Sequence, residues 1–534
     1  SSSARQRTRR GGAECFLTTM GRRRSHGGRR GGLQALAGAG ILAAAAHSLR
    51  AAFVRTLPGG GSRGSPVRGH ISVAAGTAVA APAAEAWSLD DDAAAAVAVP
   101  LPPPEERPGY LDHANFKEGE WVRVWQAMTS NDDLPEVPDF SPSDAPYWLY
   151  HLGRTGFFAA QGFASVAAAQ VASVLSPTGA ADVTPYFLRT ASPDTILRGM
   201  ARQNLETFRQ DLGYIKAGYF KAPYDMSPKH RQWDPTYVAD KGLRYIREAT
   251  ATLRRSAEKA DTRVSSIESG DDLYPPYYRH TFHYQTDGWL SSESAEVYET
   301  STETLFLGRQ DAMQRSSLVH IAEHMRGREA MQTRLLEIAC GTGRLMTFTR
   351  DNWPAMDVTA SDLSPFYLEK ARKNNAYWER EFAPRGSAVM GKASFVQANA
   401  EALPFEAESF DIVVSVYLFH ELPAEAQDAV VAEAARVLAP GGLFVLTDSV
   451  QLGDRPVLDE SIGNFGSFAE PHYQAYIRRD LAALARDHGL EPWAKEQSSS
   501  TKSVSFRKPS AGEAAAGSGG RSPGEDPETA AVAE

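Results

Sequence analysis

Cysteine is scarce in this chain, which has only Cys15 and Cys340 among its 534 residues. Two cysteines so far apart exclude the disulfide framework of a small secreted protein, and we expect no disulfide-linked partner. The chain also lacks the skewed composition of fibrous or wholly disordered proteins, because 42% of its residues are hydrophobic and 23% are charged. These proportions are typical of globular proteins.

Acidic residues are nearly absent from the start of the chain. Residues 1–70 hold thirteen arginines, no lysine and a single acid, Glu14, and so carry a net charge of +12. Because the whole chain has a formal charge of -9, about -21 remains on residues 71–534. A body this acidic repels phosphate backbones, and we expect no nucleic-acid partner.

Residues 1–105 are rich in Arg, Ala, Gly and Ser and poor in large apolar side chains. This composition cannot form a core and predicts a disordered transit or targeting segment followed by a linker. If Met20 is the true start, the basic run 22–30 and the apolar stretch 33–46 resemble a signal peptide at the head of a two-part leader. Such leaders direct import into complex plastids, so we expect a plastid (chloroplast) location, with the mitochondrion as the alternative. The same start would also match an N-myristoylation pattern.

Residues 106–275 show apolar positions at helical spacing and are predicted to form a mainly helical region whose role stays open. The clearest helices are expected at Ser192–Tyr214 and Tyr237–Lys259. A further stretch, Gly156–Leu175, has twenty uncharged residues, which is long enough to cross a bilayer. Its alanines and glutamines favour a buried core helix instead, and peripheral membrane contact is left open. Residues 510–534 are expected to be a disordered tail.

Between Arg334 and Pro509, short apolar runs alternate with amphipathic stretches, which predicts an α/β fold with a doubly wound sheet. The expected strands are Arg334–Ile338, Asp357–Ser361, Ala393–Gln397, Phe410–Val414 and Leu443–Thr447. A helix at Ala424–Leu438 precedes the last of these. The C-terminal stretches His472–His488, Glu491–Glu496 and Ser503–Arg507 have the helix–strand–strand order that would complete such a sheet.

A glycine-containing turn follows the first strand. Its residues are Ala339, Cys340, Gly341, Thr342 and Gly343, and its glycines allow a tight turn and a close approach of the backbone to a ligand. Nineteen residues beyond Gly343, the next strand ends at Asp362, whose carboxylate can accept both hydroxyls of a ribose. The pattern therefore predicts a nucleotide-type site, although the glycines could also simply close the turn and Asp362 could cap a helix.

Five stretches lie in this order along the chain: LLEIACGTGRL, VTASDLSP, NAEALPF, FDIVVSVYLFHEL and ARVLAPGGLFVL. Together they resemble the class I S-adenosylmethionine (SAM)-dependent methyltransferases, and most closely the type 11 group that includes the ubiquinone/menaquinone-biosynthesis methyltransferases. The resemblance implies a Rossmann-like domain of seven strands, the last antiparallel, over residues 276–509 with a helical lead-in. It implies S-adenosyl-L-methionine as the cofactor and transferase activity.

The resemblance also assigns the cofactor-binding positions. Glu337 and the loop residues Ala339, Cys340, Gly341, Thr342 and Gly343 should face the methionine part, Asp362 with Leu363 the ribose, and Asn399 and Ala400 the adenine. Ala339 stands where relatives usually have glycine, a change expected to cost little. Asn399 replaces a common aspartate and can still accept a hydrogen bond from the adenine amino group. Asp411 is expected to be structural.

A general base is needed only if the methyl acceptor must lose a proton. The candidates implied for catalysis are His420, His472 and Tyr417, within a wider set that includes Glu421, Asp448, Tyr473, His283, Tyr284 and Trp289. His280 and His283 are three residues apart without an evident third ligand, so no metal site is expected.

The acceptor is expected to be a small, apolar molecule such as a quinone, a prenyl lipid or a pigment precursor, because the acidic body disfavours nucleic acids. Two alternatives stay open. A nicotinamide-dependent oxidoreductase would need a third glycine where Met346 stands. A non-catalytic SAM-binding or assembly protein would use the helical region as a docking surface.

Overall fold

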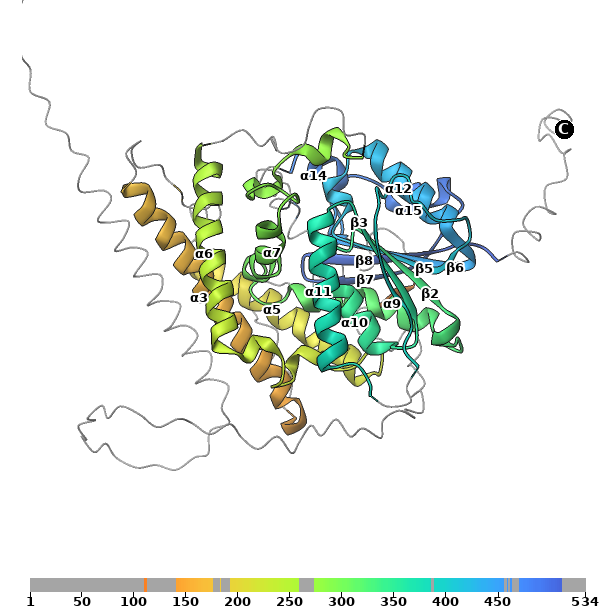
Figure 1. Ribbon diagram of the computed structural model, residues 1–534, viewed down its shortest axis with the longest axis horizontal. Helices are drawn as coiled ribbons and strands as arrows, with labels where there is room; N and C mark the ends of the chain where they lie inside the picture. Colours follow the sequence, from red (N-terminus) through yellow and green to blue (C-terminus); the bar gives the residue numbers. More distant parts are fainter. Residues whose placement is uncertain are drawn as a thin grey trace, which may run out of the picture.

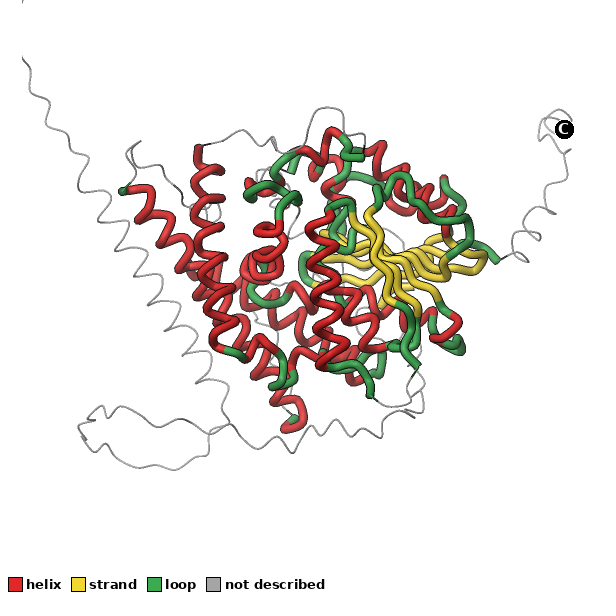
Figure 2. The backbone as a smooth tube through the Cα atoms, in the orientation of Figure 1, coloured by secondary structure: helices red, strands yellow, loops and turns green. Residues whose placement is uncertain are grey.

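The computed structural model describes residues 110–112, 141–175, 183, 193–258, 273–385, 389–455, 459, 462 and 470–510. The predicted targeting segment therefore lies outside the described residues, as does almost all of the predicted tail, and the predicted domain boundaries stay predictions. A twisted sheet is covered by helices on both faces, and a further group of helices lies against one side (Figures 1 and 2).

The sheet has eight strands in the order β1-β7-β8-β6-β5-β2-β3-β4. The strands are β1 (Tyr110–Asp112), β2 (Arg334–Ile338), β3 (Asp357–Asp362), β4 (Ala393–Gln397), β5 (Phe410–Val416), β6 (Leu438–Ser449), β7 (Glu491–Ser498) and β8 (Thr501–Arg507). Strands β2 to β6 are parallel, and β8 is antiparallel to both of its neighbours. The predicted seven-stranded fold with an antiparallel last strand is confirmed.

The eighth strand, β1, was not predicted. It comes from the region expected to be mainly helical and pairs antiparallel with β7 at the edge of the sheet. Three residues carry too little pattern for a strand to be recognised, since a strand this short depends on its partner for its hydrogen bonds. The N-terminal region thus extends the sheet as well as adding helices.

Alternation along the strands builds two cores. Neighbouring residues of a strand point to opposite faces, so Leu335 packs in one apolar cluster and Leu336 in the other. The helices that cover the sheet are α9 (Ser316–His324), α10 (Arg344–Asn352) and α11 (Pro365–Glu381) on one face, and α12 (Ala424–Val437), α14 (Tyr473–Tyr476) and α15 (Leu481–Asp487) on the other.

The N-terminal helices are α3 (Ala145–Val174), α5 (Pro193–Lys216) and α6 (Pro235–Glu258), and the lead-in adds α7 (Ser292–Leu305) and α8 (Gln310–Gln314). The helices predicted at Ser192–Tyr214 and Tyr237–Lys259 are confirmed as α5 and α6. Short 3-10 helices connect them: η5 (Pro142–Asp144), η6 (Tyr224–Met226), η7 (Arg231–Trp233), η8 (Pro276–Arg279), η9 (Phe282–Tyr284), η10 (Ala330–Gln332) and η11 (Phe419–Glu421).

Buried ion pairs join these N-terminal helices to the sheet domain. Arg315 at the start of α9 donates to both carboxylate oxygens of Asp211 on α5, at 2.9 and 2.7 Å, and both side chains are 2% exposed. Arg344 at the start of α10 pairs with Asp225 of η6 and with Asp311 of α8. Charges buried at such depth must stay paired, so the helical region and the sheet domain depend on each other.

The expectation of a buried core helix at Gly156–Leu175 is wrong. α3 lies beside α6 at the edge of the molecule farthest from the sheet, and only 28% of its most apolar window is buried (Figure 1). Leu149, Phe157 and Val171 are 66%, 43% and 60% exposed. The helix packs through one flank, whereas its composition is apolar all round, and periodicity alone cannot tell such a helix from a core helix. Within the described residues, Pro142–Val174 is the one helix long and apolar enough to cross a membrane.

Candidate active site

The glycine loop connects β2 to α10, as predicted. Gly341 and Gly343 have φ values of 55° and 71°, in the left-handed region. A Cβ on Gly343 would lie 2.9 Å from the Cβ of Ala371 on α11, whereas nothing lies within 4 Å of a Cβ placed on Gly341. Gly343 is therefore needed for the packing of the loop, and Gly341 leaves open space beside the backbone.

Ala339 also has a positive φ, of 53°. A non-glycine residue in this region costs roughly 1–2 kcal/mol. The expectation that alanine costs little at this position is therefore wrong, because the turn requires a left-handed residue there.

Asp362 at the end of β3 lies against the loop. Its Oδ2 accepts a hydrogen bond from the N–H of Gly341 and its Oδ1 accepts one from the N–H of Ser364, both at 2.8 Å. Burial raises the pKa of this carboxyl to about 6. Ser364, not Asp362, caps α11. The structure thus brings Asp362 and the glycine loop together, and Leu363 is buried beside them.

Glu337 on β2 is 3% exposed, and its Oε2 is buried without a hydrogen-bond partner. Burial, with the nearby Asp362, raises its pKa to about 8. A buried carboxylate oxygen without a partner is rare in proteins and points to a donor supplied by a ligand. Together with the open space beside Gly341, it fits the amino group of the expected cofactor.

The residues predicted to face the adenine, Asn399 and Ala400, lie after β4. The Oδ1 of Asn399 accepts a hydrogen bond from the N–H of Glu401 at 3.0 Å, and Ala400 packs against the core below. Tyr277 of the lead-in donates to Glu401 at 2.7 Å. Gln397 is 3.3 Å from the hydroxyl of Tyr274. Sequence reasoning missed this tyrosine cover, because nothing in the spacing of the lead-in shows which sheet edge it crosses.

A cavity of about 430 Å³ begins at the glycine loop. Its floor includes Glu337, Ala339, Cys340, Gly341, Thr342 and Tyr417. Its walls come from α3, η7, α6, α7 and α8 and carry the aromatic residues Tyr150, Phe157, Phe158, Trp233, Tyr237 and Tyr298. The charged residues in the walls are largely paired with one another, for example Arg154 with Glu303 at 2.7 Å. The helical region therefore builds most of this cavity.

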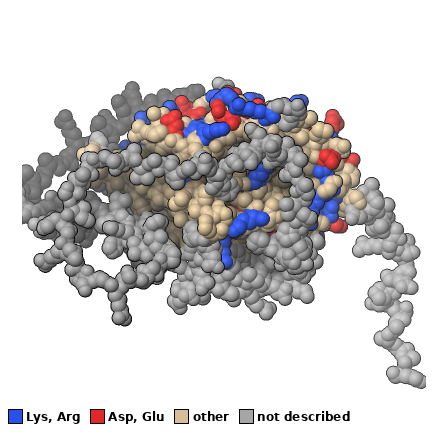
Figure 3. Space-filling model, turned by 90° about the horizontal axis from the view of Figure 1, so that it is seen from below, with Lys and Arg blue, Asp and Glu red and all other residues tan. Residues whose placement is uncertain are grey.

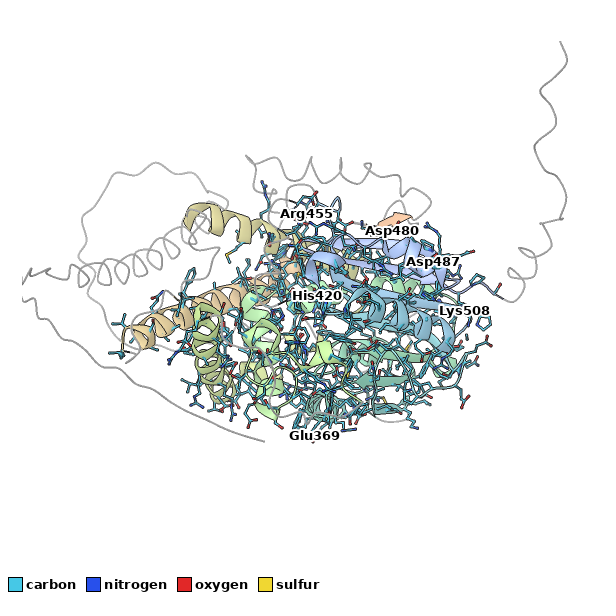
Figure 4. The ribbon with its side chains drawn as sticks, turned by 90° about the horizontal axis from the view of Figure 1, so that it is seen from above. Glu369, His420, Arg455, Asp480, Asp487 and Lys508 are labelled. Atoms are coloured by element: carbon cyan, nitrogen blue, oxygen red, sulfur yellow. The ribbon has the colours of Figure 1, made fainter. Side chains whose placement is uncertain are left out.

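His420 lies in η11, directly after β5, and is central in the molecule (Figure 4). Its Nδ1 is 2.6 Å from Oδ1 of Asp448 at the end of β6. Burial opposes a charge on the ring, but Asp448 outweighs it and raises the pKa of His420 to about 10. The ring is therefore a protonated imidazolium at neutral pH. In this state it can donate a proton but cannot accept one.

The charged cluster extends to the lead-in. His283 lies 3.0 Å from Glu470 through Nδ1 and 3.5 Å from Glu421 through Nε2. The Oε2 atoms of both glutamates are buried without a hydrogen-bond partner. His283 has a φ of 54°, so the backbone is strained where it delivers this side chain. The sequence placed His283 and Glu421 among the wider candidates but could not bring them together.

The other two catalytic candidates are Tyr417, whose ring lies 6.5 Å from that of His420, and His472. His472 is half-buried, and its ring is 6.2 Å from that of Tyr277. The hydroxyl of Tyr417 is 2.7 Å from Oγ1 of Thr501, and burial raises the pKa of the phenol further above neutral pH. Asp411 accepts a hydrogen bond from the N–H of Arg334 at 2.8 Å, the structural role expected. In the described part of the chain, no group of three or more His, Cys, Asp or Glu side chains could hold a metal ion.

Comparison with known proteins identifies the domain that carries this site. Residues 335–442 match the methyltransferase domain family, and they include the glycine loop, Asp362, Asn399 and His420. The chain contains a methyltransferase domain over these residues. The match counts against a nicotinamide-dependent enzyme and leaves the helical region outside the family.

Curated relatives of the methyltransferase domain include three with named activities. A malonyl-[acyl-carrier protein] O-methyltransferase of Paenibacillus is 34% identical over 24% of this chain and 42% of its own length. A ubiquinone/menaquinone biosynthesis C-methyltransferase of Shewanella pealeana is 32% identical over 22% of this chain and 42% of its own. A demethylmenaquinone methyltransferase of Thermus thermophilus is 34% identical over 22% of this chain and 49% of its own. The chain thus spans less than half the length of these relatives.

Solved structures similar to this chain are also methyltransferases by name. A SAM-dependent methyltransferase from Methanosarcina mazei is 19% identical and covers 33% of this chain and 92% of its own, with a TM-score of 0.27. A sarcosine dimethylglycine methyltransferase homologue from Galdieria sulphuraria is 15% identical and covers 39% and 88%, with a TM-score of 0.28.

Proposed function

We propose that this protein transfers a methyl group from SAM to a small, largely apolar acceptor in a plastid, with a quinone, a prenyl lipid or a pigment precursor as the acceptor class. The observation that carries the proposal is the cavity that runs without a break from the glycine loop to aromatic walls on α3, η7 and α7. The relatives named for ubiquinone and menaquinone biosynthesis support a quinone-type acceptor.

Each part of the cofactor would contact different residues of the site. Glu337 would accept from the methionine amino group, Asp362 would hold the ribose, and the Asn399–Ala400 loop would face the adenine. When bound, the sulfonium supplies an electrophilic methyl group. The loop and the helical walls would orient the acceptor toward it and exclude water, an alignment worth up to roughly 7–11 kcal/mol in favourable cases.

His420 would act as a cation that positions the end of β5. Asp448 holds the proton on the imidazole, and the acidic Glu421 lies 3.7 Å from Nε2. An acceptor that reaches the site as a phenolate or enolate needs no base, so a permanent imidazolium beside it is compatible with catalysis. An acceptor that must lose a proton would require another group.

The first test is calorimetric titration of the full chain with SAM, S-adenosylhomocysteine and NADH. Micromolar binding of the first two and none of the third is expected. Glu337→Gln should weaken SAM binding at least tenfold, whereas the matched control Glu369→Gln, on the exposed side of α11, should leave it unchanged. NADH binding, or no binding of SAM, would overturn the proposal.

The alternative of a non-catalytic SAM-binding protein makes a different prediction. With radiolabelled SAM and a panel of quinone, prenyl-lipid and pigment-precursor acceptors, the enzyme should label at least one acceptor, and Asp362→Ala should abolish the labelling. SAM binding without transfer to any acceptor of the panel would favour the non-catalytic alternative.

A further inference from the structure

The outer side of α3 is apolar over its whole described length. Every position between 149 and 175 that is exposed carries a glycine, alanine, valine, leucine or phenylalanine. At 1.5 Å per residue this stretch is about 40 Å long. Its largest exposed side chains are Leu149, Leu152, Phe157, Val171, Val174 and Leu175, which we call the α3 face.

Charge on α3 is turned inward. Arg154 is its single Arg, Lys, Asp or Glu residue, and this side chain is 14% exposed and paired with Glu303 and Asp311. Gln161 likewise donates to Thr304 on α7 at 2.7 Å. The helix therefore turns Arg154 and Gln161 toward the protein and presents only apolar side chains and glycines outward, which monomeric soluble proteins rarely do over a large area.

The cavity opens onto the α3 face. Leu149 and Phe157 both line the cavity and are exposed, at 66% and 43%. Trp233 on η7 also lines the cavity and is 52% exposed. Side chains that are at once exposed and cavity-lining mark an entrance, so the route to the glycine loop begins at this apolar face.

We propose that the α3 face inserts into the surface of a lipid bilayer and that the acceptor enters the cavity from the membrane between α3 and η7. The second part rests on the proposed function, and the first does not. A bilayer is the occupant favoured because every exposed position of α3 between 149 and 175 carries an apolar side chain or a glycine. Trp233, which lines the cavity and is 52% exposed, is also a residue type that settles at the headgroup level.

The geometry favours a helix that lies in the membrane surface rather than across it. α3 is held along α6 and α7 by one flank, and α6 carries the exposed, charged pair Arg244 and Asp240. Charged side chains next to the helix cannot follow it into the hydrocarbon core. On the upper edge of the view in Figure 3, which the grey residues leave uncovered, acidic and basic side chains lie next to one another. The proposed attachment therefore rests on the apolar α3 face and not on a charged patch.

The test is co-sedimentation of the full chain with vesicles of phosphatidylcholine, with and without phosphatidylglycerol. The wild-type protein should sediment with both. The combined variant Leu152→Gln, Val171→Gln, Val174→Gln, Leu175→Gln should lower the bound fraction at least tenfold. Met331→Gln with Val389→Gln is the matched control, because these side chains are 62% and 59% exposed elsewhere. Brominated lipids should quench the wild-type fluorescence, and Trp233→Phe should remove part of that quenching.

Three results would overturn the proposal. If the wild-type protein sediments with neither kind of vesicle, the protein has no membrane-binding surface. If the α3 variant still sediments with the vesicles, the membrane-binding surface lies elsewhere on the chain. A dimer seen by sedimentation velocity, and lost in the α3 variant, would assign the face to a second copy. Calorimetry with SAM separates the two proposals, because the α3 variant should bind SAM like the wild type, and vesicle binding without SAM binding would remove only the proposed function.

Discussion

The imidazole of His420 and the carboxylate of Asp448 form a buried ion pair, with 2.6 Å between Nδ1 and Oδ1. Asp448 also accepts hydrogen bonds from the N–H groups of Phe419 and His420, so it holds the segment after β5 as well as the ring. The pair lies at the carboxyl ends of two adjacent parallel strands, the edge at which open α/β sheets bind their ligands.

Removing Asp448 should therefore lower the pKa of His420. In Asp448→Asn, the largest contribution that raises the pKa is lost, while burial and the weaker effects of Glu421 and Glu470 remain, so the pKa should fall from about 10 toward the ordinary value of about 6.5. Histidine NMR titration checks the shift. An unchanged titration of His420 would show that Asp448 does not hold its proton.

The same pair makes stability depend on pH. Because the folded-state pKa of His420 is raised, its contribution is complete below about pH 6.5 and is lost as the pH rises through about 10. The free energy of unfolding should fall over this window in the wild type and fall less in His420→Gln. Urea denaturation at several pH values measures both, and equal slopes would contradict the assignment.

Glu337 should lower the stability of the free protein, although it should contribute to the binding of SAM. Its pKa is raised to about 8, so the cost of ionising it in the folded protein grows as the pH rises from the ordinary carboxyl value of about 4.3 to about 8 and is complete above that. Glu337→Gln should raise the unfolding free energy of the free protein by roughly 1–3 kcal/mol at pH 9, and by much less at pH 5. Thermal denaturation with and without SAM checks the prediction, since the variant should also lose most of the stabilisation that SAM gives the wild type.

Two substitutions in the glycine loop should change the stability of the protein in opposite directions. Ala339→Gly should stabilise the protein by about 1 kcal/mol, because φ is 53° at this position and glycine relieves the strain. Gly343→Ala should destabilise it by more, because φ is 71° and the new methyl group would meet Ala371 at 2.9 Å. Chemical denaturation of both variants measures the two signs, and two changes of the same sign would show that the turn differs from the one described.

The pair between Arg315 and Asp211 should couple the helical region to the methyltransferase domain. Arg315→Met leaves a buried carboxylate unpaired and should cost about 3–5 kcal/mol. The exposed pair of Arg244 with Asp240 is the control, and Arg244→Met should change stability by less than about 1 kcal/mol. A single unfolding transition, shifted as a whole, is expected. A separate early transition would mean that the helical region unfolds by itself.

Much of the methyltransferase domain follows from local pattern. The strands β2 to β6 were predicted within a few residues because each is a short apolar run next to a turn signal. The glycine loop and Asp362 follow directly on strand ends, so their meeting at one edge of a parallel sheet needs no further information. The sequence by itself therefore determined the fold class and the cofactor side of the site.

Only the tertiary structure decided which side chains meet around His420 and which side of α3 is exposed. His283 and Glu470 are far apart in the chain and meet because the lead-in crosses the sheet edge, a contact that no periodicity encodes. β1 exists through its pairing with β7. The exposure of α3 depends on which flank α6 covers, since an apolar helix has the same composition in a core and on a surface. Local patterns specify elements and turns, whereas long-range packing decides which of them share a cavity and which lie exposed.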